Sequence, residues 1–338
     1  NHITVKEFSM GFGPKLFQFH KKETQYTLRL IPLGGYCMML SEDDEENEND
    51  ENSFEKKSIW ARMAVVLAGP AMNFVIAFLF SMVIIHFCGS DPAIIGAVYN
   101  KDNIEKYQIE NAEEYFNGVY PAEEAGISDG DQVLKIEGST VKNFRELQIY
   151  LQIYGDGSPI DLTLEKEDGT VYDTTVHPAK TPDGYKIGIM SVGYQLPKNF
   201  GELCKYSAYE TRYWVKATFL SLKLIVTRQV SSDEVSGPVG VAKNMNDTFN
   251  EAAKSSVLDL FLNWMNYIVL LSANLGVMNL LPIPGLDGGR FIFLLIEAVT
   301  RKKVPKDKEN IVTLIGFVLV MLLMVVILFN DIKNVFFH

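Results

Sequence analysis

The chain has 338 residues, of which 47% are hydrophobic and 22% charged, and its formal net charge is −11. The negative balance argues against a nucleic-acid partner, because proteins that bind nucleic acid carry basic patches. The three cysteines form no CxxC pair, which argues against a disulfide framework or a cysteine zinc site. This mixture of many apolar and many charged residues indicates apolar spans joined to polar domains.

The first region, residues 1–61, contains a strand-like stretch, TQYTLRLIPLGGYCMML, at 24–40. A strand places alternate side chains on one face, which here collects Thr24, Tyr26, Leu28 and Leu30. The residues typical of a turn come next: Pro32, Gly34 and Gly35. We predict a β-hairpin within 24–40 that is apolar enough to re-enter a membrane. An ordinary cytoplasmic hairpin is the alternative.

An acidic segment, SEDDEENENDEN, follows at residues 41–52. Its low hydrophobicity and its charge of one sign are typical of a solvated, disordered loop, and we predict such a loop here. Acidic metal scavenging is a minor alternative.

The first membrane span is predicted at residues 62–88. From Met63 to Cys88 there is no charged residue, and about 20 apolar residues suffice for a helix to cross the hydrocarbon core. The sequence GPAMN lies inside it. Small residues allow close helix approach, and a polar residue such as Asn73 tends to face protein rather than lipid. A hydrogen bond between helices would account for Asn73 without any functional role.

The middle of the chain reads as a different kind of sequence. Strand-like alternation occurs at 94–100 and 159–169, and a hairpin partner is predicted at 171–180. Residues 143–154 have helical apolar spacing between these strands. We therefore predict a small α+β domain at 92–195, inserted between membrane spans and followed by an amphipathic linker at 196–256.

Two further apolar regions follow, at 257–299 and 311–329. The first is interrupted by PIPGLDGG, and irregular backbone at membrane depth is tolerated only where protein or a wet cavity surrounds it. The loop RKKVPKDK, residues 301–308, holds five basic residues and is predicted to be cytoplasmic. Counting spans back from this loop places the domain at 92–195 outside. The fold class is thus a polytopic α-helical membrane protein with three spans in this chain.

Four stretches together resemble the site-2 proteases, the intramembrane zinc metalloproteases, in their bacterial RseP-like branch. NLLPIPGLDGGR (279–290) is similar to the N-x-x-P-x-P-x-L-D-G-G signature of that family. IPLGGY (31–36) followed by RMAVVLAGPAMNF (62–74) resembles its re-entrant hairpin and the helix after it. GVYPAEEAGISDGDQVLKIEG (118–138) resembles a PDZ domain, and SGPVGVA (236–242) the segment before a later span.

The resemblance implies roles for individual residues. Asp287 carries over as a zinc ligand, and a carboxylate oxygen suits zinc in a site that keeps one position for water. Bound zinc would lower the pKa of that water and polarise the scissile carbonyl. Asn279 matches the signature asparagine, with a supporting or a capping role. The remaining residues expected to contact substrate are Tyr26, Leu28, Leu30, Gly34, Gly35 and Asn73.

The other two zinc ligands and the catalytic base of the family come from H-E-x-x-H, which this sequence does not contain. In the family that motif lies on a helix shortly before a segment like ITVKEFSMGFGP, which here follows His2 directly. We therefore expect that the first helix has been cut off and that the chain as given is catalytically incompetent.

The resemblance implies an activity for the intact protein. It is expected to be a membrane-embedded zinc endopeptidase of the bacterial cytoplasmic membrane. It would cleave single-pass membrane proteins, such as anti-sigma factors or signal-peptide remnants, in regulated intramembrane proteolysis. The alternative from another class is a non-catalytic, PDZ-bearing membrane scaffold, which would have no need of the charge of Asp287. A secondary transporter is a weaker alternative, because no inverted repeat is visible.

Overall fold

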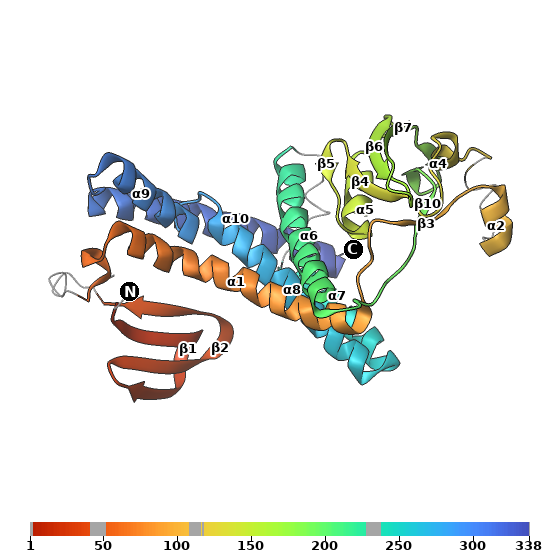
Figure 1. The fold of residues 1–338 in the computed structure, drawn as a ribbon. Helices are drawn as coiled ribbons and strands as arrows, with labels where there is room; N and C mark the ends of the chain where they lie inside the picture. The colour runs from red at the N-terminus through yellow and green to blue at the C-terminus, as the bar shows by residue number, and fades with distance from the viewer. Residues whose placement is uncertain (1–2, 41–51, 108–115, 117, 228–237, 338) are drawn as a thin grey trace. The chain divides into compact units, whose positions relative to one another are not determined.

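A computed structural model describes residues 3–40, 52–107, 116, 118–227 and 238–337, and it divides into two compact units. The first unit comprises Asn1–Met72 with Met278–Met324, and the second comprises Asn73–Val277 with Val325–His338. Three helices each contribute residues to both units (Figure 1): α1 (Ile59–Cys88), α8 (Val257–Leu280) and α10 (Lys306–Phe337). Most of the predicted acidic loop, residues 41–51, lies outside the described residues.

A β-sheet built from β1 (Val5–Lys21) and β2 (Thr24–Met39) belongs to the first unit. The chain turns between the strands at Lys22, whose φ is +56°. Residues 5–10 pair both with 35–39 and with 25–28, and residues 15–21 pair with 24–29. The hairpin predicted within 24–40 is therefore wrong. Its two halves lie on opposite sides of residues 5–10, because β1 supplies the pairing partners of both.

The sheet has one polar and one apolar face. On the polar face Ser9 and Thr27 are buried, and Arg29 donates to the Ser9 hydroxyl at 2.9 Å and pairs with Glu7 at 3.0 Å. On the other face Tyr26 stacks on Phe19, with ring centroids 5.0 Å apart. The large apolar side chains of this part of the sheet are exposed: Phe8, Met10, Phe17, Phe19, Leu28 and Leu30. The predicted alternation of 24–30 is thus present, and Leu28 and Leu30 on its apolar face are exposed.

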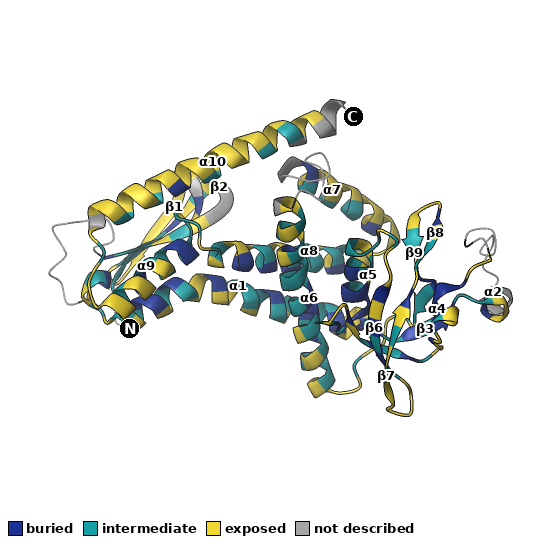
Figure 2. Ribbon diagram, turned by 90° about the horizontal axis from the view of Figure 1, so that it is seen from above, coloured by how far each residue is buried: buried dark blue, intermediate teal, exposed yellow. Residues whose placement is uncertain are grey.

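The three predicted apolar spans are confirmed as helices long enough to cross a membrane: Ile59–Cys88, Val257–Leu280 and Asp307–Asn330. The interruption within 257–299 is also confirmed. Helix α8 ends at Leu280, and a separate helix, α9 (Asp287–Thr300), follows six residues of irregular chain. Many apolar side chains of α10 are exposed, as lipid-facing residues would be (Figure 2).

The second unit contains an α+β domain near the predicted position. Its four-stranded sheet has the order β5-β4-β6-β7, from β5 (Ser139–Thr140), β4 (Gln132–Ile136), β6 (Ile160–Glu165) and β7 (Val171–Val176). The predicted pairing of the strands after 159 and 171 is confirmed, since Ile160 lies opposite Val176. Beyond β7 the chain forms a short hairpin from β8 (Ala179–Thr181) and β9 (Gly184–Lys186).

The remaining elements of the α+β domain complete its core. β3 (Ile95–Val98) pairs with β10 (Ile189–Ser191), and the short helices are α2 (Lys101–Tyr107) and α4 (Pro121–Glu124). The predicted helix at 143–154 is α5 (Phe144–Ile153), and the Asn143 side chain caps it by accepting from the Glu146 amide at 2.8 Å. The buried core includes Val133, Ile136, Leu147, Leu162 and Leu164.

Two helices follow the α+β domain, α6 (Phe200–Val226) and α7 (Pro238–Ser255). Helix α6 binds α5 through buried charge. The Glu146 carboxylate, whose side chain is 1% exposed, accepts two hydrogen bonds of 2.9 Å from Arg212. Arg145 of α5 pairs with Glu210 of α6 at 2.5 Å. Burial raises the pKa of Glu210, and the charge of Arg145 opposes that shift.

Replacing Glu146 should loosen the packing of α5 on α6. Glu146→Ala removes the buried carboxylate that accepts from Arg212 and from the Lys142 amide, although Arg212 keeps its hydrogen bond to Thr140 O, and the loss of partners at such a site costs about 1–3 kcal/mol. We expect urea unfolding of the detergent-solubilised chain, followed by circular dichroism, to show a loss of this size. Glu124→Ala, at an exposed position of α4, is the matched control. Equal stability of the two variants would contradict the assigned role of Glu146.

Candidate functional site

The break between α8 and α9 is built from residues that cannot continue a helix. Pro282 and Pro284 have no backbone N–H to donate, and Gly285 has a φ of +97°, which favours glycine. The intervening chain closes on itself, since the Ile283 amide donates to Leu281 O at 2.7 Å and the Leu286 amide to Ile283 O at 3.1 Å. Asp287 is thereby the first residue of α9.

The glycines that follow Asp287 allow backbones to touch. A Cβ at Gly288 would lie 2.2 Å from Leu281 O, and one at Gly289 would lie 2.5 Å from Ile283 O. On the neighbouring helix α10, a Cβ at Gly316 would lie 2.0 Å from Pro284 O. These distances are far below contact, so any other residue would push the broken segment away from α9 or α10.

Asp287 lies against the first predicted span. Its Oδ2 atom is 3.3 Å from where a Cβ on Gly69 of α1 would stand. The segment AGP of α1 and the segment LDGG, more than 200 residues apart, therefore meet at this carboxylate. The carboxylate is half-buried and lies at a helix N-terminus, where the helix dipole favours negative charge.

An antiparallel contact between α1 and α9 extends from this point. Gly69, Val66 and Arg62 lie on one face of α1, spaced by three and four residues. They meet α9 in reverse order: Gly69 lies at Asp287, Val66 shares an apolar cluster with Leu294, and Arg62 pairs with Glu297. The Arg62 Nη2 to Glu297 Oε1 distance is 2.5 Å, and the Arg62 side chain is 6% exposed.

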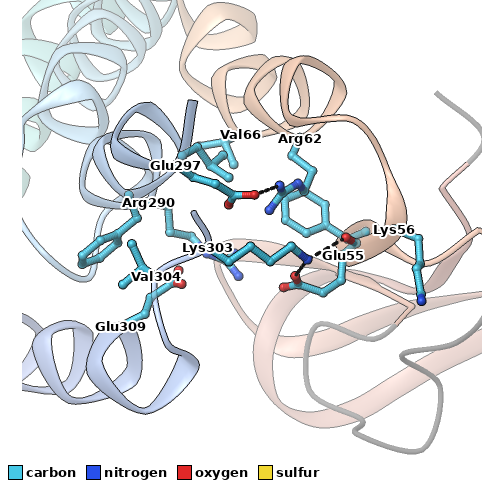
Figure 3. Close-up of a pocket in the computed structure, with 12 residues that line it drawn as sticks. Glu55, Lys56, Arg62, Val66, Arg290, Glu297, Lys303, Val304 and Glu309 are labelled. Atoms are coloured by element: carbon cyan, nitrogen blue, oxygen red, sulfur yellow. Dashed lines mark hydrogen bonds and ion pairs between the residues drawn. The ribbon is translucent and has the colours of Figure 1, made fainter. Parts of the chain in front are cut away.

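A charged cavity of about 370 Å³ lies at the Glu297 end of this contact (Figure 3). Besides the Arg62–Glu297 pair it contains a looser pair, Lys303 and Glu55, 3.5 Å apart. The cavity is lined by acidic and basic residues: Glu55, Lys56, Arg62, Arg290, Glu297, Lys303 and Glu309. The ion pairs account for the charged lining of this cavity, because they hold the helix ends together.

The other predicted site residues lie in three places. Asn279 is in the last turn of α8 and is half-buried, and Asn73 lies one turn beyond Gly69 on α1, also half-buried. The remaining residues belong to β2: Tyr26, Leu28, Leu30, Gly34 and Gly35. A Cβ at Gly35 would lie 2.5 Å from Ser9 O, so this glycine permits close strand contact. The surroundings of Gly34 lie outside the described residues.

The family resemblance implies that the segment 24–40 adds a strand to an extended substrate, and its pairing limits where that can occur. Residues 25–28 have partners on both sides, so their backbone groups are already used. Residues 35–39 pair with 5–10 on one side. Within the described part of the sheet they form the edge, and strand addition requires an edge.

Several residues of the site were not predicted from the sequence. Arg62 and Gly69 lie within a segment that was recognised, but nothing in the sequence indicates that their partners are Glu297 and Asp287. Gly316 lies in an apolar run where a single glycine is unremarkable. A basic residue near the start of an otherwise uncharged span, as Arg62 is, is a signal from which a buried ion pair could have been predicted.

The described residues do not form a zinc site by themselves. Among them no three His, Cys, Asp or Glu side chains come close enough to hold a metal ion. Asp287 offers one carboxylate where a catalytic zinc needs three protein ligands.

Comparison with known proteins decides the family. The model of peptidase family M50 matches residues 1–323, which include both β1–β2 and the LDGG segment. The chain belongs to peptidase family M50. This match confirms the resemblance to the site-2 proteases, and together with three apolar helices it supports a membrane protein.

Relatives within family M50 align over nearly the whole chain. A Clostridium acetobutylicum protein with zinc metalloprotease in its name is 36% identical over 334 residues, covering 98% of this chain and 89% of the relative. Zinc metalloprotease RasP of Geobacillus kaustophilus is 31% identical, covering 99% and 92%. Regulator of sigma-W protease RasP of Bacillus subtilis is 28% identical, with the same coverage.

Two glycine substitutions should separate folding of the break from placement of Asp287. Gly288→Ala forces a Cβ against the backbone of Leu281 and should lower the free energy of unfolding by roughly 1–3 kcal/mol, as overpacking does. Gly69→Ala meets only the movable carboxylate, so it should displace Asp287 and leave stability nearly unchanged. Thermal unfolding in detergent measures both, and equal losses would contradict this distinction.

Replacing only one member of the Arg62–Glu297 pair should lower the stability of the chain strongly. Arg62→Met or Glu297→Met alone leaves an uncompensated buried charge and should destabilise the chain by about 3–5 kcal/mol. The double variant, with apolar side chains at both positions, should recover most of that loss. A double-mutant cycle in urea tests this, and additive losses would show that the two charges do not interact.

Proposed function

We propose that the chain forms the LDGG-bearing part of a membrane-embedded zinc metalloendopeptidase of the site-2 type. Asp287 is the residue that it contributes to the metal. The observation that carries the proposal is the placement of this carboxylate, half-buried at a helix break and against Gly69, in a chain that matches family M50. The names of the relatives, which include zinc metalloproteases, agree with zinc as the metal.

The proposed substrates are single-pass membrane proteins cleaved in regulated intramembrane proteolysis, with anti-sigma factors and signal-peptide remnants as examples. The Bacillus subtilis relative is named as a regulator of sigma-W, which agrees with the first class. Three apolar helices support catalysis within the bacterial cytoplasmic membrane. Asn279, in the turn of α8 that precedes the break, is proposed to support the site.

The β1–β2 sheet is proposed to re-enter the membrane and to hold the substrate in an extended form. Its exposed apolar face, around Leu28 and Leu30, supports contact with lipid or with an apolar substrate. Its segment 35–39, with Gly35 at one end, pairs with residues 5–10 and lies at the edge of the described part of the sheet. Main-chain pairing tolerates many substrate sequences, because it does not depend on side chains.

The α+β domain is proposed to be PDZ-like, to lie outside the cytoplasm and to control which substrates reach the site. A cavity of about 550 Å³ lies between α5 and the segment around Tyr185 and Ile187. Such a groove between a helix and a strand can hold the end of a peptide. Steric exclusion of large, untrimmed substrates by the same domain is compatible with this geometry.

The 338-residue chain alone should neither bind zinc tightly nor cleave substrate. It has one carboxylate of a three-ligand zinc site and no H-E-x-x-H, so we expect no tight, stoichiometric zinc and no cleavage of a tagged single-pass substrate. Elemental analysis of the purified chain after dialysis tests the first point. One tightly bound zinc per chain would overturn the proposed ligand set.

Addition of the absent motif should create a functional role for Asp287. An apolar helix with H-E-x-x-H fused before Asn1 should yield cleavage of a single-pass substrate in proteoliposomes. Asp287→Ala in this fusion should lower the rate by more than the roughly 10–100-fold that outer-shell partners cost, because a ligand itself is lost. Asp259→Ala, in the first turn of α8, is the control. Unchanged cleavage in Asp287→Ala would show that Asp287 is not a zinc ligand, whereas no cleavage by the unsubstituted fusion would favour a non-catalytic scaffold.

A further inference from the structure

The segment between β10 and α6, VGYQLPKNF at residues 192–200, exposes large apolar side chains. Tyr194 is 65% exposed, Leu196 64% and Phe200 71%. Three such residues within seven positions form an apolar patch that the described part of the chain leaves exposed. Exposed apolar patches of this kind mark contact with a membrane or with another protein.

Main-chain hydrogen bonds tie this segment to the end of the first span. The Ser90 amide donates to Gln195 O at 2.9 Å, and the Gln195 amide donates to Ser90 O at 2.8 Å. Gly89 has a φ of +82°, and a Cβ there would lie 2.6 Å from Gln195 O, so only glycine permits this approach. Because α1 ends at Cys88, the bridge holds Tyr194 and Leu196 beside the point where α1 leaves the membrane.

A cavity of about 520 Å³ places a second span at the same level. It is lined by Tyr194, by Ile84 and Cys88 from the last turns of α1, and by Asp259 and Leu262 from the first turns of α8. Both helices are apolar enough to cross a membrane. The patch therefore adjoins the ends of two spans, where a bilayer passes from hydrocarbon to headgroups.

The start of α6 fixes Phe200 in the same segment. Asn199 accepts from the Glu202 amide at 2.9 Å, and the Glu202 carboxylate accepts from the Lys198 amide at 2.7 Å. These bonds resemble a capping box, except that the Glu202 carboxylate accepts from the residue before the N-cap, and they fix the chain at the start of the helix. Phe200 is thus held by backbone geometry and not by packing of its ring, which stays exposed.

We propose that Tyr194, Leu196 and Phe200 insert into the lipid interface and anchor the α+β domain to the bilayer surface beside α1. Tyrosine is enriched at this depth, because its ring is apolar and its hydroxyl stays in contact with water. The partner is lipid, because the patch adjoins the ends of the two spans α1 and α8. The proposal does not depend on zinc, on cleavage or on the side of the membrane.

Site-directed spin labelling of the full chain in bilayer nanodiscs tests the anchor. Cys37, Cys88 and Cys204, all free thiols, are first replaced by serine. Single cysteines then carry a nitroxide at positions 194, 196 and 200. Oxygen concentrates in hydrocarbon and a neutral nickel complex concentrates in water, so the ratio of their collision rates with the label reports depth.

Two reference positions calibrate the measurement. The first label is placed by Leu319→Cys, in the middle of the span in α10. The second is placed by Val171→Cys, at the start of β7 in the same α+β domain, where the native side chain is 55% exposed. We expect ratios at 194, 196 and 200 several-fold above that of Val171→Cys and below that of Leu319→Cys. Ratios equal to that of Val171→Cys at all three positions would overturn the proposal and leave the patch for a protein partner. Because every labelled side chain is exposed, the labels should not prevent folding.

Discussion

The placement of the Asp287 carboxylate depends on the absence of side chains around it. Gly288 and Gly289 let the broken chain lie on the first turn of α9, and Gly316 lets α10 touch Pro284. Gly69 leaves space on α1 for the carboxylate itself. Because protein interiors are packed at the density of organic crystals, even one methyl group at these contacts must displace a backbone.

Ionic and apolar contacts then fix the position of α9. The same face of α1 offers Gly69 to Asp287, Val66 to the cluster around Leu294, and Arg62 to Glu297. A buried ion pair is weak evidence for stability, but it discriminates strongly against alternative registers, since a slip would leave two charges unpaired. The Arg62–Glu297 pair thus fixes the register in which Asp287 meets Gly69.

The α+β domain is joined to the helices by contacts of a different kind. Its helix α5 is bound to α6 through Glu146 and Arg212, and α6 reaches α8 through a hydrogen bond of 2.5 Å between Thr218 and Asn274. The Ser90–Gln195 bridge adds a main-chain connection to the end of α1.

The sequence by itself determined the elements that local patterns specify. Run length identified the three spans, prolines and glycines identified the break before Asp287, and helical apolar spacing identified α5 within 143–154. Only the tertiary structure decided which distant segments meet. The strand at 24–30 found its partners in residues 5–21 and not within 24–40, and Arg62 found Glu297 across 235 positions. Periodicity and turn chemistry act over a few residues, whereas strand pairing, ion pairs and glycine contacts depend on which surfaces fit in three dimensions.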